Sequence, residues 1–175
     1  ALYKYRYALK APSQDKAPAM VTGGIVHGTL EMLHTAVMRK QPLPTLKQLQ
    51  EFAQDCLSAA ASDGTHFAFK QGEDMAKLRE DANRLIQAYW ESGIWDCDIV
   101  DAEKCFSLPI PGSDIALIGA IDLIVKLPDG TIELRELKTA ARSFDATRLL
   151  YDPQMSIYYA ALKAMGYPNQ KMAFC

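Results

Sequence analysis

Three side chains that could carry out hydrolysis interrupt two apolar stretches of the sequence. Asp122 lies within GAIDLIVKL, and Glu136 and Lys138 lie within TIELRELKT, with a Pro-Asp-Gly turn sequence between the two stretches. Two carboxylates and a backbone carbonyl form an oxygen-rich site of the kind that Mg²⁺ and Mn²⁺ prefer. A lysine beside such a site can orient the attacking water and offset the charge of the transition state. A metal and a lysine together can hydrolyse a phosphodiester.

The same three residues also have a structural interpretation, in which Lys138 forms a salt bridge with Glu136 or Asp122 at the end of a sheet. The loop between the strands separates the two hypotheses, because directly opposed residues in an antiparallel pair share a face. A two-residue loop would place the carboxylates on opposite faces. A three-residue loop, with Gly130 in the left-handed conformation, would oppose Asp122 to Glu136 and Ala120 to Lys138. A shared site therefore requires the three-residue loop, or a bulge that restores the same parity.

Periodicity and chain breakers predict the elements that must position these residues. Apolar residues recur at helical spacing before residue 93, and β-branched, alternating stretches follow it. We expect helices over about residues 21–39, 45–61, 73–92 and 145–165, and strands within residues 98–110, 114–127, 131–139 and 171–175. This order predicts an α/β or α+β fold. The stretch LYKYRYALK near the N-terminus is expected to form a strand or an extended arm.

The composition excludes some classes of protein and leaves the partner open. The chain of 175 residues suits one domain, and its apolar runs are too short to span a membrane. The net charge of −2 gives no general argument for nucleic acid, although residues 1–50 carry seven Lys and Arg against two Asp and Glu. That basic part could meet phosphates, or the surface charge could simply be uneven. The four cysteines match no common zinc site, so we expect free thiols and a reducing, cytoplasmic location.

The pattern of Asp122, Glu136 and Lys138 resembles the D-x(n)-E-x-K signature of the PD-(D/E)XK nuclease superfamily. GAIDLI has the Gly-x-Ile-Asp form of that family, and ELKTA has its Lys-Thr. Gln154 and Tyr158 resemble the Q-x-x-x-Y motif of the RecB-type exonuclease branch, and GGIVHGTLE resembles the branch's G-x-x-x-H helix motif. The resemblance covers about residues 22–166. It implies a single nuclease domain over residues 1–175, with residues 40–95 as a helical insertion.

The resemblance implies a restriction-endonuclease-like fold, with a central mixed sheet flanked by helices. It also implies roles for individual residues. The catalytic residues would be Asp122, Glu136 and Lys138. The ligands of Mg²⁺ or Mn²⁺ would be His27, Asp122, Glu136 and the carbonyl of Leu137. The contacts to DNA would be Gln154 and Tyr158, which share a helical face, with Tyr151 one turn earlier on the same side.

No iron–sulfur cluster is expected, although some RecB-type nucleases carry one on four cysteines. The branch places one cysteine before the histidine motif and three near the C-terminus. Here no cysteine precedes His27, and only Cys175 follows the tyrosine motif. Glu31 and His34 share a helical face with His27, but only His27 is singled out by the resemblance.

The predicted function is a metal-dependent DNA nuclease, with an exonuclease favoured, in which metal-activated water attacks phosphorus. One alternative is a non-catalytic module of the same fold that binds DNA or serves assembly. Another is a structural domain whose acid–lysine cluster is a salt bridge. DNA is the expected partner, with a second copy of the chain or a recombination or helicase protein as a further one. No membrane contact is expected. Strandedness, polarity and endonuclease against exonuclease action stay open.

Overall fold

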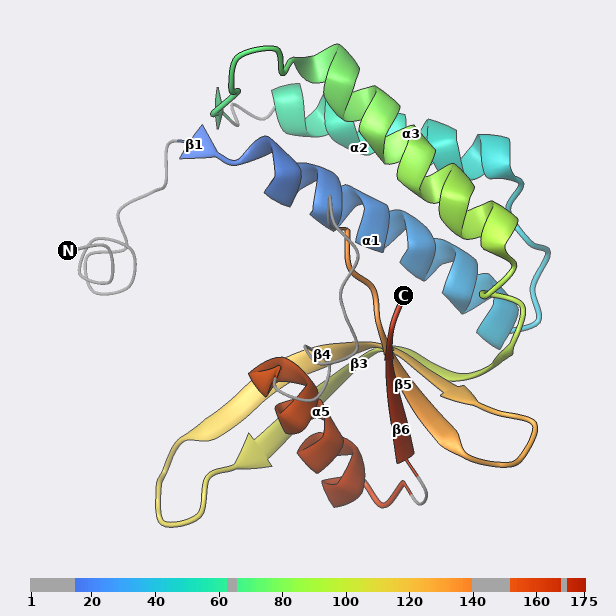
Figure 1. Ribbon diagram of the computed structural model, residues 1–175, viewed down its shortest axis with the longest axis vertical. Helices are drawn as coiled ribbons and strands as arrows, with labels where there is room; N and C mark the ends of the chain where they lie inside the picture. Colours follow the sequence, from blue (N-terminus) through green and yellow to red (C-terminus); the bar gives the residue numbers. More distant parts are fainter. Residues whose placement is uncertain (1–14, 63–65, 140–151, 168–169) are drawn as a thin grey trace.

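A computed structural model describes residues 15–62, 66–139, 152–167 and 170–175. Three long helices form one layer, and a sheet with a shorter helix across it forms the other part of the molecule (Figure 1). Among the described residues, no helix is both long and apolar enough to cross a membrane. The elements in chain order are β1 (Asp15–Lys16), α1 (Pro18–Met38), α2 (Leu46–Ser62), β2 (His66–Phe67), α3 (Met75–Ser92), β3 (Asp98–Pro109), β4 (Ala116–Lys126), β5 (Ile132–Glu136), α5 (Pro153–Ala164) and β6 (Gln170–Phe174).

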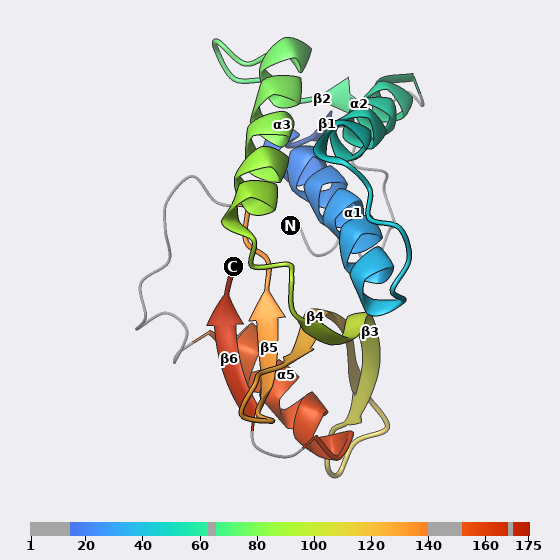
Figure 2. The same ribbon diagram turned by 90° about the vertical axis from the view of Figure 1, so that its right-hand side faces the viewer.

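The larger sheet is mixed, as the fold class predicts. Its strands lie in the order β3-β4-β5-β6, and the first three form an antiparallel meander. The chain then passes α5 and returns as β6, which pairs with β5 in parallel. Figure 2 shows these four strands below the layer of α1, α2 and α3. This arrangement confirms the α/β fold with a central mixed sheet flanked by helices.

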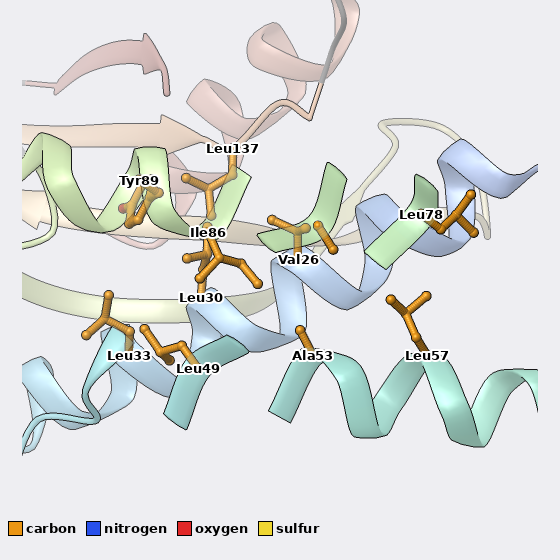
Figure 3. Packing of buried hydrophobic residues seen from close by; sticks show 11 residues of the cluster. Val26, Leu30, Leu33, Leu49, Ala53, Leu57, Leu78, Ile86, Tyr89 and Leu137 are labelled. Carbon is orange, nitrogen blue, oxygen red and sulfur yellow. The ribbon is translucent and has the colours of Figure 1, made fainter. Parts of the chain in front are cut away.

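Three apolar clusters hold the described residues together, and the smallest of them lies between β3, β4 and the end of α1. The first joins α1, α2 and α3, and Leu137 at the end of β5 reaches into it (Figure 3). The second lies between the sheet and α5, where Met155, Tyr158 and Leu162 pack on Ile124 and Leu134. The helices within residues 40–95 therefore share a core with α1. That they are an insertion in a single domain over residues 1–175 stays a prediction.

Local sequence signals fix where the helices begin and end. Thr45 and Gln48 exchange hydrogen bonds as a capping box before α2, and the side chain of Asp74 caps α3. Gly93 ends α3 in the left-handed conformation, with φ of 67°. The expected helix over residues 145–165 is observed as α5, which begins with Pro153 after the capping residue Asp152. Residues 145–151 and LYKYRYALK lie outside the described residues.

The loop between β4 and β5 has the three-residue form that a shared site requires. Leu127 N–H donates to the carbonyl of Thr131 at 2.8 Å, and Gly130 N–H donates to the carbonyl of Leu127 at 2.9 Å. Gly130 has φ of 83°, in the left-handed region. The observed register pairs residue 123 with residue 135, and its continuation opposes Asp122 to Glu136. The two carboxylates therefore share one face.

The strand β6 supports the end of β5 through backbone hydrogen bonds beyond the paired residues. Cys175 N–H donates to the carbonyl of Glu136 at 2.8 Å, and Lys138 N–H donates to the carbonyl of Cys175 at 2.9 Å. Since side chains alternate along an extended strand, Glu136 and Lys138 point to the same side. The backbone that carries these two side chains is therefore held by β6 at the point where β5 no longer pairs with β4.

Candidate metal and catalytic site

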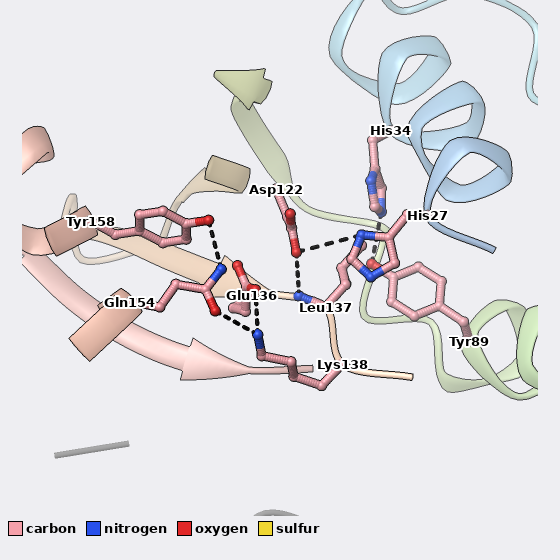
Figure 4. A network of polar contacts seen from close by, with 9 residues as sticks. All are labelled: His27, His34, Tyr89, Asp122, Glu136, Leu137, Lys138, Gln154 and Tyr158. Atoms are coloured by element: carbon pink, nitrogen blue, oxygen red, sulfur yellow. Dashed lines mark hydrogen bonds and ion pairs between the residues drawn. The ribbon is translucent and has the colours of Figure 1, made fainter. Parts of the chain in front are cut away.

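Asp122 lies where β4 and β5 separate. The last paired residues are Leu123 and Arg135, so the next backbone N–H of β5 that faces β4 needs another acceptor. The Oδ2 atom of Asp122 accepts this bond from Leu137 N–H at 2.8 Å (Figure 4). The same oxygen lies 3.8 Å from Nδ1 of His27, which α1 projects toward the sheet. The carboxylate therefore joins the sheet to the helical layer.

Lys138 donates hydrogen bonds to one charged partner and to one neutral partner. Its Nζ atom donates to Oε1 of Glu136 at 2.6 Å and to Oε1 of Gln154 at 2.7 Å. The amide nitrogen of Gln154 donates in turn to the hydroxyl of Tyr158 at 2.8 Å, one turn further along α5. Figure 4 shows this chain of contacts running from the sheet to α5. Gln154, which the resemblance assigns to DNA, thus also orients the lysine.

Glu136 retains one oxygen that could bind a cation. The residue is only 3% exposed, and its Oε2 atom is buried with no hydrogen-bond partner among the described residues. Burial raises the pKa of Glu136 to about 7, against the pull of the hydrogen bond from Lys138, and the charge of Asp122 raises it further. An unpartnered buried carboxylate oxygen is costly. A divalent cation at this position would remove that cost, so the donor set fits a metal.

The structure adds Glu103, which the sequence alone did not identify. Ligand atoms of His27, Glu103 and Asp122 lie within 4.8 Å of one another. Burial raises the pKa of Glu103 to about 7, with further contributions from the charges of Asp122 and Glu31. Its φ of 48° is left-handed, which is uncommon for a glutamate inside a strand. Such strained residues are often found at functional sites.

The register of the first hairpin explains the position of Glu103. Ala102 pairs with Leu123, and Lys104 pairs with Ile121, so Glu103 lies across from Asp122. Glu103, Asp122 and Glu136 therefore occupy facing positions on three neighbouring strands. Aligning β3 with β4 from the sequence would have given this signal, but the loop between them is six residues long and fixes no unique register.

The structure brings most of the predicted site together. Every described residue of the predicted set belongs to one of two groups of contacts, which the adjacent residues Glu136 and Leu137 link through the backbone: His27, Asp122 and Leu137 in the first, and Glu136, Lys138, Gln154 and Tyr158 in the second. Tyr151 lies outside the described residues. His34 belongs elsewhere, since its Nε2 atom lies 2.8 Å from the hydroxyl of buried Tyr89 and burial lowers the pKa of the imidazole to about 4. It joins α1 to α3 as a neutral side chain.

The stability of the metal-free protein is expected to fall as the pH rises from about 5 to about 8. The pKa of Glu136 and of Glu103 is about 7 in the folded protein, against an ordinary value of 4.5. Between these values the two glutamates bind more protons in the folded state than in the unfolded state. Together they outweigh the opposite contribution of His34, whose pKa of about 4 favours folding as the pH rises, so acid favours folding. Urea unfolding in EDTA across this pH range would measure how the free energy of unfolding depends on pH. Saturating Mn²⁺ should weaken or reverse the trend, because the ion binds deprotonated ligands. Stability that rises with pH in EDTA would contradict these shifts.

Comparisons with known proteins identify the family of this chain. A family model described as the PD-(D/E)XK nuclease superfamily matches residues 1–175. One subunit of an ATP-dependent helicase/deoxyribonuclease, from Streptococcus pyogenes serotype M1, is 36% identical over 70 residues. Those residues are 39% of this chain and 6% of that relative, so the likeness concerns a small part of a much longer protein. Because the family match extends over all 175 residues, the chain belongs to the PD-(D/E)XK nuclease superfamily.

Proposed function

We propose that this chain is a divalent-metal-dependent deoxyribonuclease, and more specifically an exonuclease, that hydrolyses phosphodiester bonds. The observation that carries the proposal is the buried Oε2 atom of Glu136, which has no partner among the described residues and lies beside a lysine that is held on both sides. A purely structural salt bridge would use both oxygens or leave the free one in water. Here the free oxygen is instead kept dry and available for a cation.

The residues that would hold Mg²⁺ or Mn²⁺ are oxygen donors with one imidazole. The proposed set is His27, Glu103, Asp122, Glu136 and the carbonyl of Leu137. Carboxylate oxygens suit both ions, and the imidazole favours Mn²⁺. When bound, the cation supplies Lewis acidity, which neutralises phosphate charge and makes water a stronger nucleophile. The raised pKa values of Glu103 and Glu136 reflect how strongly the two carboxylates disfavour charge while no cation is bound.

The remaining groups would act on the phosphate and on each other. Lys138 places a positive charge beside the carboxylates, where it can offset the charge that develops on the phosphoryl oxygens. Gln154 fixes the direction of the lysine through its carbonyl oxygen. Tyr158 is 8% exposed, so a DNA contact would be made by its hydroxyl rather than by its ring. Tyr151 stays proposed as a third contact to DNA.

A nuclease assay with labelled DNA tests the proposal. Linear and circular molecules, each single- and double-stranded, would be incubated with the protein over a Mn²⁺ titration, with EDTA as the control. Cleavage of linear DNA that depends on Mn²⁺ and spares circles supports an exonuclease. Cleavage of circles would replace the exonuclease assignment with an endonuclease. Metal binding without any cleavage would favour the alternative below.

The alternative is a non-catalytic module of this fold that binds DNA or serves assembly. One observation favours it, namely that the relative from Streptococcus pyogenes is named as a subunit, so its activity belongs to an assembly. By analogy, a helicase or recombination protein, or a second copy of this chain, would be the partner here. Against the alternative, the two motif carboxylates, the lysine and the proposed metal ligands are all present, and the lysine is hydrogen-bonded to Glu136. Free cysteines support a reducing, intracellular location.

His27→Ala is expected to reduce Mn²⁺-supported cleavage more than Mg²⁺-supported cleavage. Imidazole is a better ligand for Mn²⁺ than for Mg²⁺, which prefers oxygen and retains its waters. Initial rates with each ion at saturating concentration would measure the difference. His66→Ala is a matched control, since His66 is exposed on β2 and no contact within the described part of the chain joins it to the site. Equal losses with both ions would remove His27 from the ligand set.

A further inference from the structure

An apolar cavity of about 240 Å³ lies directly beside the proposed metal site. It is bounded by α1, by α3 and by the end of β5. His27 and Lys138 belong both to the cavity and to the site. The cavity therefore adjoins the site at these two residues. Its apolar walls come from Val26, Leu30, Leu85, Leu137 and Cys175.

The charges around the cavity differ sharply from those of the site. The metal site gathers three carboxylates, whereas none of the described Asp and Glu residues lines the cavity. The cation among the lining residues is Lys138, and the other polar side chains are those of His27, Tyr89, Ser92 and Thr139. A ligand that fits must thus have a neutral, largely apolar part for the interior. The end of the cavity at His27 and Lys138 adjoins the metal site, where the phosphate of the proposed substrate would bind.

The size of the cavity narrows the choice of ligand. Sites for drug-sized ligands usually measure roughly 300–1,000 Å³, so about 240 Å³ suits a single ring system and is too small for a peptide segment. An aliphatic chain would fill the interior but has no phosphate to place at the neighbouring metal site. A nucleotide has a flat neutral base for the cavity and, covalently connected to it, an anionic phosphate for the proposed site.

We infer that this cavity binds the nucleobase of the nucleotide next to the phosphate that is cleaved. The inference rests on the proposed nuclease function and deepens it by specifying the substrate. A base in a duplex is paired and stacked, so it must be unstacked and unpaired before it can enter such a pocket. The protein therefore acts on single-stranded DNA or on a frayed end. Apolar walls without a dense set of hydrogen-bond groups accept all four bases, as stacking sites for single strands do.

Oligonucleotides that carry an abasic residue test the inference with the unaltered protein. A single-stranded oligonucleotide would carry one abasic residue, moved along the strand from one substrate to the next. We expect cleavage at the phosphate beside the abasic residue to slow by about tenfold or more, the effect of losing one stacked base. The same substitution at distant positions should have little effect. Equal cleavage for every position of the abasic residue overturns the inference and leaves the nuclease function intact.

A variant at the rim of the cavity provides a second test of the inference. Ala88 is exposed on α3 and lines the cavity, so Ala88→Leu narrows the entrance with a residue that favours helices. We expect it to slow cleavage of the intact strand by about tenfold and to abolish the difference between intact and abasic strands. Gln87→Leu is the matched control, because Gln87 is exposed on the same helix and does not line the cavity. An Ala88→Leu protein that still discriminates intact from abasic strands overturns the inference.

A binding measurement separates this inference from the proposed function. The oligonucleotide would carry 2-aminopurine in place of each base in turn, and Ca²⁺ would replace Mn²⁺. Entry of the fluorescent base into the cavity should raise its emission at one position, since it leaves its stacked neighbours, and Ala88→Leu should remove that rise. If the protein shows the rise but cleaves no DNA with Mn²⁺, the nuclease function fails and the pocket stands. If no position shows a rise, the pocket assignment is wrong.

Discussion

Lys138→Ala is expected to lower the rate of DNA cleavage by about 10²–10³-fold and to leave Mn²⁺ binding largely intact. The lysine is not among the proposed ligands, and its two hydrogen bonds go to Glu136 and Gln154. Its positive charge is thus available for the phosphate and not for the ion. Removing a preorganised positive group acts on the transition state, so the loss should appear in kcat.

The measurement must separate the loss of the lysine's own charge from the effect of that loss on the pKa of Glu136. Without Lys138, Glu136 loses the hydrogen bond that opposes its burial, so its pKa should rise above the present value of about 7. Mn²⁺ affinity of the variant should therefore be compared with the parent at a pH of about 8 or above, where protons compete least. Lys126→Ala, an exposed lysine at the end of β4, is the matched control. Cleavage by Lys138→Ala at near the parent rate would remove the lysine from the mechanism.

Asp122→Asn and Glu136→Gln are expected to lower Mn²⁺ affinity by about hundredfold or more, since even residues behind a metal ligand often cost 10–100-fold. Each change replaces a charged oxygen donor by a neutral one while preserving shape. Cleavage should then fall below detection at Mn²⁺ concentrations that saturate the parent. Calorimetric titration with Mn²⁺ gives the affinity directly. Unchanged affinity in both variants would show that the two carboxylates do not form a metal site.

The Glu136→Gln variant should have a second, opposite effect on the protein without metal. At a pH of about 8 the parent must keep an ionised, 3% exposed carboxylate with one oxygen unpartnered among the described residues, whereas the amide is neutral, so we expect a gain of roughly 1–3 kcal/mol in the free energy of unfolding. Asp122→Asn should gain less, because the Asp122 carboxylate accepts the hydrogen bond of Leu137. Urea unfolding in EDTA measures both. A Glu136→Gln protein that is less stable than the parent would contradict this account of the site.

Much of the site could be predicted from the sequence because its signals are local. Glu136 and Lys138 are two residues apart in one strand, and Gln154 and Tyr158 are one helical turn apart, so spacing alone places each pair on one side. The Pro-Asp-Gly turn then allowed only two registers for Asp122, and the observed hydrogen bond from Leu127 N–H to the carbonyl of Thr131 selects the one that a site requires. The helix ends were predictable for the same reason, since capping residues act within one turn.

The residues that sequence reasoning missed depend on contacts between distant segments. Glu103 reaches the site only through the alignment of β3 with β4 and through an unusual left-handed backbone, and no local pattern indicates either. The bond between Lys138 and Gln154 depends on how α5 crosses the sheet, which the motif alone does not specify. The cavity beside His27 likewise exists only because α3 packs on α1 at the end of β5. Tertiary packing decides all three.

The backbone hydrogen bonds between Cys175 and the end of β5 have a consequence for biosynthesis. A nascent chain that has released residues 1–139 from the ribosome already carries every proposed metal ligand and the lysine, yet β5 lacks the neighbour that holds Glu136 and Lys138. In the proposed nuclease, cleavage should therefore require that synthesis has passed residue 175, because only then can β6 pair with β5 along its whole length. Because Lys138 N–H donates to the carbonyl of Cys175, a pulling force applied at Cys175 would reach Lys138 through a single hydrogen bond.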